Sequence, residues 1–225
     1  KNTFIVSKIK SDLFISNAEE NILNSLSNLG VETLDALLLH DSNLLYSWKD
    51  DYSYTVDRLK ENGRIKYFGV SIYTEEDFNL AIGNEEINFI QIPFNIFDQR
   101  AIELDWFKKA KENNKLIFIR SIFLQGLLLM DIKDIPCKIS EAKEYIYILE
   151  KLSLEFGLSR SELALGFVDT MAIDSIILFG CDNLEQAKNN IELYNSDKKL
   201  NNLIISKIKK EFANVNEKIY NPSKW

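Results

Sequence analysis

Four polar side chains each end a short apolar run, and all four are of types that take part in chemistry. Lys8 ends the run FIVSK, His40 ends LDALLLH, Ser71 ends KYFGVS and Gln91 ends FIQ. Lysine and histidine serve as proton-transfer groups, and a hydroxyl together with an amide can bind both sides of a ligand amide. In a β/α barrel the carboxyl ends of the strands open onto one face, which carries the chemistry. These runs therefore predict one candidate site built from strand ends.

The elements that must position these side chains are strands alternating with amphipathic helices. Two further runs, LIFIRS and SIILFG, continue the series of strands. Ser16 with Glu19 is typical of a capping box that opens a helix, and Gly30 is placed to end that helix. We expect strands over residues 3–8, 34–40, 66–71, 87–95, 116–121 and 175–180. We expect helices over residues 16–30, 52–62, 74–83, 99–113, 140–157 and 198–213, and two more that begin at Ser159 and Leu184.

This alternation indicates an α/β fold with a parallel sheet and helices outside it. A doubly wound open sheet would carry a glycine-rich phosphate turn, and no GxGxxG occurs in the sequence. We therefore favour a (β/α)8 TIM-type barrel, of which the chain shows about six of the roughly eight strand–helix units. The chain opens directly on a strand, without Met. We expect residues 1–225 to be one barrel domain whose first two units are missing.

Composition narrows the class of protein. The 225 residues are 46% hydrophobic, enough for one substantial core, and their formal net charge is −7. No basic patch with interleaved aromatics is visible, and the longest apolar stretch, IFLQGLLLM, is too short for a membrane span, so we expect neither nucleic acid nor membrane as a partner. Cys137 and Cys181 are far apart and outside any CxxC spacing, which argues against disulfides and metal and fits the cytoplasm. We interpret Cys181 as a small apolar filler rather than a reactive thiol.

Several motifs, in order along the chain, carry a resemblance to a known family. FIVSK resembles the strand that ends in the catalytic lysine of the aldo-keto reductases, and LGVETLDALLLH resembles the block that ends in their catalytic histidine. GRIKYFGVSIY is similar to the GkIryiGvSnf signature, SIFLQGLLL to the SPLGQGLL loop, and GCDNLEQAKNNI to the PGasnpeQleeNl segment. The resemblance covers nearly the whole chain and implies a nicotinamide-dependent oxidoreductase barrel.

The resemblance also implies catalytic roles. In this family a tyrosine donates the proton that accompanies hydride transfer, a lysine lowers the pKa of that tyrosine, and a carboxylate steadies the lysine. A histidine orients the carbonyl. Lys8 and His40 would be the lysine and the histidine. The resemblance places the tyrosine and the aspartate in the second barrel unit, which this chain lacks, so we expect the chain as printed to hold only half of the catalytic set. The alternatives are that Lys8 is a solvated surface charge and that His40 is a satisfied core histidine.

The family's cofactor contacts fall on a second set of residues. Ser71 and Gln91 would hold the nicotinamide carboxamide, although the usual Asn after the serine is Ile72 here, and Ser71 could simply end its strand. Arg120 stands where many members stack a tyrosine on the nicotinamide, and it could instead face a charged substrate. The remaining contacts predicted by the resemblance are Ser121, Phe123 and Gln125 on the pyrophosphate loop, Gly180 at the start of the phosphate loop, Gln186 near the 2′-phosphate and Asn190 at the adenine.

We expect an NAD(P)H-dependent carbonyl reductase that acts on an aldehyde or ketone, a sugar-derived carbonyl being one candidate. NADPH is expected over NADH, although Gln186 lacks the charge that some members place at the 2′-phosphate. Exposed helix polarity is the alternative explanation for Gln186 and Asn190, and it explains Gln186 equally simply. The alternative function is a non-catalytic barrel that binds nicotinamide nucleotide and acts as a regulatory or interaction subunit. An unclosed barrel exposes strand edges, so a second copy or the missing N-terminal segment is expected to pair with them.

Overall fold

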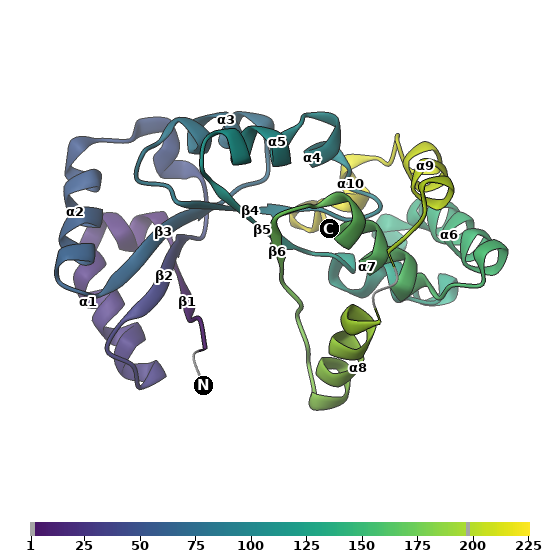
Figure 1. Ribbon diagram of the computed structural model, residues 1–225, viewed down its shortest axis with the longest axis horizontal. Helices are drawn as coiled ribbons and strands as arrows, with labels where there is room; N and C mark the ends of the chain where they lie inside the picture. The colour runs from purple at the N-terminus through teal and green to yellow at the C-terminus, as the bar shows by residue number, and fades with distance from the viewer. Residues whose placement is uncertain (1–2, 197–198) are drawn as a thin grey trace. The chain divides into compact units, whose positions relative to one another are not determined.

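The computed structural model describes residues 3–196 and 199–225. Six strands are neighbours in chain order within one sheet, and the three pairs formed by the first four strands run parallel (Figure 1). The strands are β1 (Val6–Ile9), β2 (Leu34–Leu39), β3 (Ile65–Ser71), β4 (Phe89–Pro93), β5 (Leu116–Arg120) and β6 (Ser175–Ile177). The predicted α/β fold with a parallel sheet is therefore confirmed.

Helices separate the strands, as the sequence predicted. The α-helices are α1 (Ser11–Leu29), α2 (Asp50–Glu61), α3 (Glu75–Gly83), α4 (Arg100–Glu103), α5 (Trp106–Glu112), α6 (Ala142–Phe156), α7 (Arg160–Met171), α8 (Leu184–Asn195), α9 (Asn202–Glu211) and α10 (Glu217–Tyr220). Short 3₁₀ helices are η1 (Asn43–Ser47), η2 (Leu124–Leu129), η3 (Ile132–Asp134), η4 (Cys137–Ile139) and η5 (Pro222–Lys224). Within the described residues, none of these helices combines the length and apolar character that crossing a bilayer requires.

The chain divides into two compact units. Unit 1 comprises residues 1–92 and 108–118, and unit 2 comprises residues 93–107 and 119–225. Unit 1 contains β1 to β3, most of β4 and helices α1 to α3. Unit 2 contains β6 and helices α6 to α10.

In unit 1, the strand period places large side chains on one face of the sheet and a glycine on the other. The Phe68 ring lies 5.6 Å from that of Phe14 and 6.2 Å from that of Trp48, and helices α1 and α2 flank strands β1 to β3 (Figure 1). The next residue, Gly69, faces the opposite side, where a Cβ atom would lie 2.6 Å from the Phe89 ring. Glycine is needed here because the neighbouring strand carries a ring at this level.

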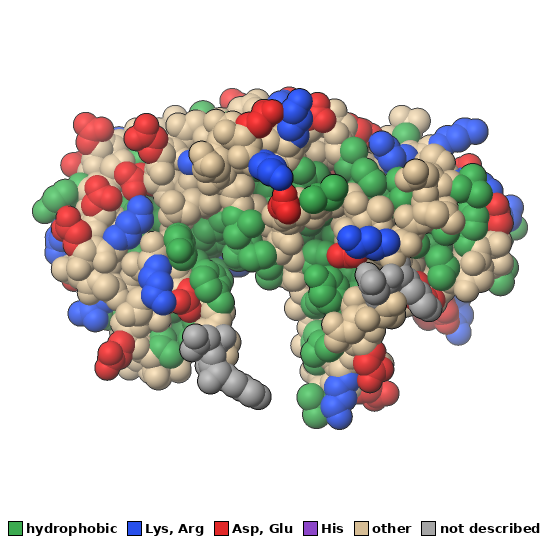
Figure 2. Space-filling view, in the orientation of Figure 1, with side chains coloured by type: hydrophobic (Ala, Val, Ile, Leu, Met, Phe, Trp, Pro, Cys, Tyr) green, Lys and Arg blue, Asp and Glu red, His purple; other side chains and the backbone are tan. Residues whose placement is uncertain are grey.

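The face that bears Gly69 also carries exposed apolar side chains. Phe4, Val6 and Tyr67 are 53%, 37% and 49% exposed, and the rings of Phe4 and Tyr67 are stacked 6.4 Å apart. Figure 2 shows apolar side chains gathered over this part of unit 1. The predicted pairing of the sheet edges with a second copy or with a preceding segment stays a prediction.

Unit 2 has an aromatic core of its own. Phe94 packs against Phe167 at 5.6 Å between ring centroids, and Phe97 packs against Phe212 at 5.2 Å. Helices α6, α7 and α9 each contribute a buried apolar stripe to this unit. Helix α8 differs, because none of its side chains, all of which are described, is buried.

Most predicted helix ends are confirmed. Gly30 and Gly63 adopt φ near 67°, and capping boxes are present at Thr74 with Asp77 and at Ser159 with Glu162. Strand β1 begins at Val6 rather than at residue 3.

Two helix predictions were wrong in their bounds, and the last predicted helix is present but shorter than expected. The first helix begins at Ser11 and is kinked at Asn17, whose side chain takes the capping role assigned to Ser16 by accepting from the Glu20 N–H. The helix predicted over 99–113 is interrupted at Asp105, which has a φ of 56°. The helix predicted over 198–213 is α9 (Asn202–Glu211), and residue 198 lies outside the described residues.

Candidate active site

Lys8, His40, Ser71 and Gln91 all belong to unit 1 and lie at the carboxyl ends of its first four strands. Ser71 is in register with Gln91. Lys8 is in register with Leu38, two residues before His40. Leu38 is in register with Gly69, two residues before Ser71. Because strand side chains alternate between faces, these registers direct all four side chains to the same face of the sheet. The strand ends thus bring the four predicted residues onto one face, and their function as one site stays a prediction.

A hydrogen bond joins the first and the fourth strand across this face. The Lys8 Nζ donates to Gln91 Oε1 at 2.6 Å. Two strands lie between β1 and β4 in the sheet order, so this contact requires a curved sheet whose concave side bears both groups. Lys8 therefore points into the concave face of unit 1.

The four side chains differ in burial in a way that suits a site mouth. Ser71 and Gln91 are 3% and 2% exposed, whereas Lys8 and His40 are exposed. The backbone N–H of His40 donates to the Ile9 carbonyl at 2.8 Å, which fixes the exit of β2 against β1. A charged group and an imidazole are thus exposed on this face, whereas the two neutral polar groups are buried.

The buried pair has the hydrogen-bonding capacity that a ligand amide needs. Gln91 Oε1 is occupied by Lys8. Among the described residues, neither the Ser71 hydroxyl nor Gln91 Nε2 has a hydrogen-bond partner, and neither atom is fully sealed from solvent. A hydroxyl can donate and accept, and an amide nitrogen donates, so the pair fits a carboxamide such as that of nicotinamide.

In unit 2, three residues of the segment after β5 have a strained backbone conformation, and two of them are predicted site residues. Ser121, Leu124 and Gln125 have φ of 63°, 49° and 52°, although none of them is glycine. Such conformations cost on the order of 1–3 kcal/mol each and cluster at functional sites. Arg120 ends β5 and donates from Nη1 to the Ser121 hydroxyl at 3.3 Å. Phe123 precedes η2 and is half-buried.

A buried residue that the sequence prediction missed holds this segment in place. Asn95 is 0% exposed, and its Nδ2 donates to the Ser121 carbonyl at 3.1 Å. Its Oδ1 accepts from the backbone N–H groups of Phe97 and Asp98, at 2.9 and 3.1 Å. The signal that could have identified it is an asparagine two residues after the proline that ends a strand, where an Asx turn is favoured.

The last predicted residues surround the start of α8. Gln186 Oε1 accepts from the Asp182 N–H at 2.8 Å, and Asn190 Nδ2 lies 3.4 Å from the Cys181 sulfur. A Cβ atom on Gly180 would meet nothing within 4 Å, so no neighbouring protein atom requires a glycine there. The interpretation of Cys181 as an apolar filler was wrong, because its thiol is exposed.

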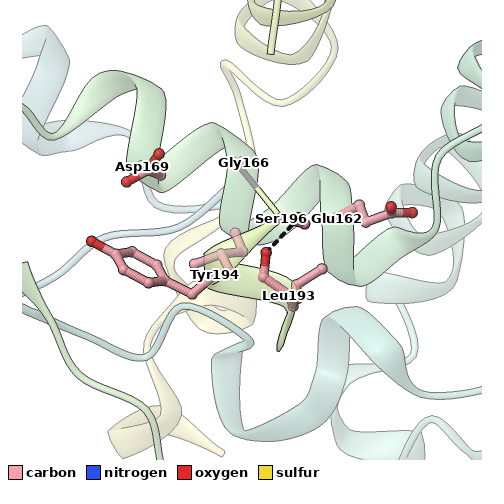
Figure 3. Close-up of a pocket in the computed structure, with 7 residues that line it drawn as sticks. Glu162, Gly166, Asp169, Leu193, Tyr194 and Ser196 are labelled. Carbon is pink, nitrogen blue, oxygen red and sulfur yellow. Dashed lines mark hydrogen bonds between the residues drawn. The ribbon is translucent and has the colours of Figure 1, made fainter. Parts of the chain in front are cut away.

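Unit 2 also contains a shallow pocket between α7 and α8 (Figure 3). The residues that Figure 3 labels along it are Glu162, Gly166, Asp169, Leu193, Tyr194 and Ser196. The Ser196 hydroxyl donates to the Leu193 carbonyl at 2.7 Å, which closes the end of α8. None of the predicted site residues lines this pocket, so the pocket gives no support to the candidate site.

Comparison with known proteins decides the family. A family model described as the aldo/keto reductase family matches residues 1–210. The chain belongs to the aldo/keto reductase family. It is 23% identical over 190 residues to the uncharacterized oxidoreductase YqkF of Bacillus subtilis. That alignment covers 79% of this chain and 60% of YqkF, so the chain spans about 60% of the length of this curated relative.

Solved aldo-keto reductases share the fold. An aldo-keto reductase from Bacillus halodurans in its apo form superimposes with a TM-score of 0.77 at 20% identity, over 99% of this chain and 75% of that one. An aldo/keto reductase from Klebsiella pneumoniae, in complex with NADP and acetate, gives a TM-score of 0.72 at 17% identity, over 93% of this chain and 70% of that one. These likenesses confirm the predicted barrel fold.

Proposed function

We propose that this chain belongs to an NAD(P)H-dependent aldo-keto reductase that reduces an aldehyde or a ketone. One observation supports this most directly: the Lys8 ammonium and the Gln91 amide meet at 2.6 Å on the face that also receives Ser71 and His40. Membership of the aldo/keto reductase family makes an oxidoreductase the expected class of enzyme.

The bound nicotinamide nucleotide supplies the hydride. Ser71 and Gln91, both buried, would hold the carboxamide of the nicotinamide through their available donor and acceptor atoms. His40, which is exposed, would donate a hydrogen bond to the substrate carbonyl oxygen and orient it. The ammonium of Lys8 would favour the ionised form of a neighbouring proton donor and so lower its pKa.

On the resemblance, none of the printed 225 residues takes the place of the family's proton-donating tyrosine. A positioned proton donor contributes about 10²–10⁴-fold to the rate. We therefore expect this chain to bind nucleotide and to reduce carbonyls only slowly by itself.

The residues proposed for the rest of the nucleotide are Arg120, Ser121, Phe123, Gln125, Gly180, Gln186 and Asn190.

NADPH is the nucleotide that we propose first. The structural relative from Klebsiella pneumoniae was crystallised with NADP. Gln186 offers no positive charge to a 2′-phosphate, and its Oε1 is engaged by the Asp182 N–H. NADH is therefore the necessary comparison in every binding experiment. The substrate remains an aldehyde or ketone, with a sugar-derived carbonyl as one candidate.

A second candidate function is a non-catalytic barrel that binds nicotinamide nucleotide as a regulatory or interaction subunit. The departures at Ile72, Arg120 and Gln186 from the family's usual residues favour it. Both candidates require nucleotide binding, and only the first requires Lys8 and His40 for carbonyl reduction.

The experiment that tests the proposal is a fluorescence titration of NADPH with the purified chain, with NADH beside it, followed by an assay of aldehyde reduction. We expect saturable NADPH binding and slow reduction that falls further in Lys8→Met and His40→Ala. Lys66→Met is the matched control, because Lys66 is a strand lysine that pairs with Asp35 at 2.6 Å on the other face of the sheet. Absence of nucleotide binding would contradict both candidates. Binding with no reduction that depends on Lys8 or His40 would favour the second.

A further inference from the structure

A buried carboxylate next to the candidate site makes contacts that its helix does not require. Asp77 lies in the first turn of α3 and is 3% exposed. Its Oδ2 accepts from the backbone N–H groups of Tyr73 and Thr74, at 3.1 and 3.0 Å. Its Oδ1 accepts from the hydroxyl of Tyr46 at 2.9 Å, and the hydroxyl of Ser42 is close enough to the carboxylate to lower its pKa.

These donors come from two different strand exits. Tyr73 follows Ser71 by two residues, and Ser42 follows His40 by two residues. One carboxylate therefore binds Tyr46 in the segment that follows His40 and Tyr73 in the segment that follows Ser71, with Ser42 close by. The segment with Ser42 and η1 leaves β2, and the segment with Tyr73 leaves β3.

Helix capping explains only half of this arrangement. The capping box of α3 needs the Thr74 hydroxyl, the Thr74 N–H and the Asp77 side chain, and all three are in place. The hydroxyls of Ser42 and Tyr46 add nothing to the cap, since they belong to another segment. Tyr46 is 50% exposed, so its ring adds little to the core, and its hydroxyl bond to Asp77 is its most specific contact.

The charge state of the carboxylate agrees with a firm junction. Burial acts to raise the pKa of Asp77, but hydrogen bonds from Ser42, the Tyr73 and Thr74 N–H groups and Tyr46 outweigh it and lower the pKa. The same contact raises the pKa of Tyr46, whose hydroxyl stays protonated as the donor. Asp77 is therefore an ionised acceptor for both segments at neutral pH.

We propose that Asp77 is a positioning residue that ties the segment after His40 to the segment after Ser71 and so holds these two groups at a fixed separation. The role rests on the proposed function of that site. It predicts that loosening this junction disturbs His40 and weakens NADPH binding, although no junction residue is proposed to touch the nucleotide.

The test uses the fact that His40 is the only histidine of the chain. Its imidazole therefore gives a single, assigned set of NMR signals, which reports on its surroundings without any activity. The variants are Tyr46→Phe and the double variant Ser42→Ala/Tyr46→Phe, which remove the hydroxyls of the β2 segment and leave both backbone bonds of the α3 cap. Ser159→Ala is the matched control, because it removes a hydroxyl from the capping box of α7 in unit 2.

We expect the His40 signals to shift or broaden in Tyr46→Phe and more so in the double variant. We expect the dissociation constant for NADPH to rise about 2- to 10-fold, which corresponds to the loss of one or two hydrogen bonds. Ser159→Ala is expected to change neither readout. His40 signals that stay unchanged in the double variant would overturn the proposal, as would an equal change in Ser159→Ala. If the unaltered chain binds no NADPH, the proposed function fails, whereas the His40 signals still decide the role of Asp77.

Discussion

Replacing Gly69 with alanine is expected to push β3 and β4 apart just before the candidate site. An ideal Cβ atom at this position would lie 2.6 Å from the Phe89 ring and 2.6 Å from the Phe89 carbonyl oxygen. A ring can turn away, but a backbone oxygen moves only with its strand. Gly69 is in register with Phe89, and two residues further along Ser71 is in register with Gln91. The strain therefore arises two residues before Ser71 and Gln91, the proposed carboxamide-binding pair.

The size of the effect follows from the contact distances. Carbon atoms pack favourably at about 3.5–4.0 Å, so the strands must separate by roughly 1 Å to admit the methyl group. Overpacking of this kind costs about 1–3 kcal/mol of unfolding free energy. With a urea dependence of about 1–3 kcal/mol per molar, the unfolding midpoint should fall by about 1 M.

The assay is urea unfolding monitored by tryptophan fluorescence. Trp48 contributes to this signal, and its ring lies 6.2 Å from that of Phe68, the residue before Gly69. Gly83→Ala is the matched control, because a Cβ atom there meets nothing within 4 Å. That control should be neutral or more stable by about 0.4–1 kcal/mol. Equal midpoints for Gly69→Ala and Gly83→Ala would refute the claim that β3 and β4 approach this closely.

Three further predictions concern single contacts. Gln91→Leu removes the amide oxygen that accepts from Lys8. It should weaken NADPH binding while lowering the free energy of unfolding by less than about 1.5 kcal/mol, because the exposed lysine is resolvated. A larger loss of stability, measured by urea unfolding, would contradict this expectation. Asp77 has a pKa below its ordinary 3.8, so its stabilisation of the fold is present above pH 3.8 and is lost as the pH falls through the lower, folded-state pKa. The difference in urea midpoint between the unaltered chain and Asp77→Asn should therefore shrink from pH 7 to pH 3. A difference that stays constant over this range would contradict the direction of the pKa shift. Ser159→Ala should cost about 1 kcal/mol through loss of the α7 cap, and a thermal unfolding midpoint equal to that of the unaltered chain would exclude the cap.

The fold could be predicted from sequence because its local signals agree with one another. Apolar runs of strand length alternate with helical patterns, and glycines such as Gly30 and Gly63 end helices in the left-handed conformation that few other residues adopt. Errors arose where two signals competed. Asn17 rather than Ser16 became the cap within α1, since both are good caps and only the packing of the kinked helix selects between them.

The candidate site could be predicted in part. Which residues end strands can be read from the sequence, but which of them meet depends on sheet curvature, and the contact between Lys8 and Gln91 spans 83 positions. The double role of Asp77 and the buried Asn95 were missed for a related reason. A sequence shows a helix cap or a turn, whereas a bond to another segment appears only when the segments are placed in space.

The most direct test of the proposed site is the NMR signal of the single histidine during a titration with NADPH. The site requires Ser71 and Gln91 to hold the nicotinamide beside His40. We therefore predict that saturating NADPH shifts the His40 imidazole signals in the unaltered chain and in Lys66→Met, and that the shift is lost in the double variant Ser71→Ala/Gln91→Leu. If fluorescence shows that NADPH binds but the His40 signals do not move, the proposed site is contradicted.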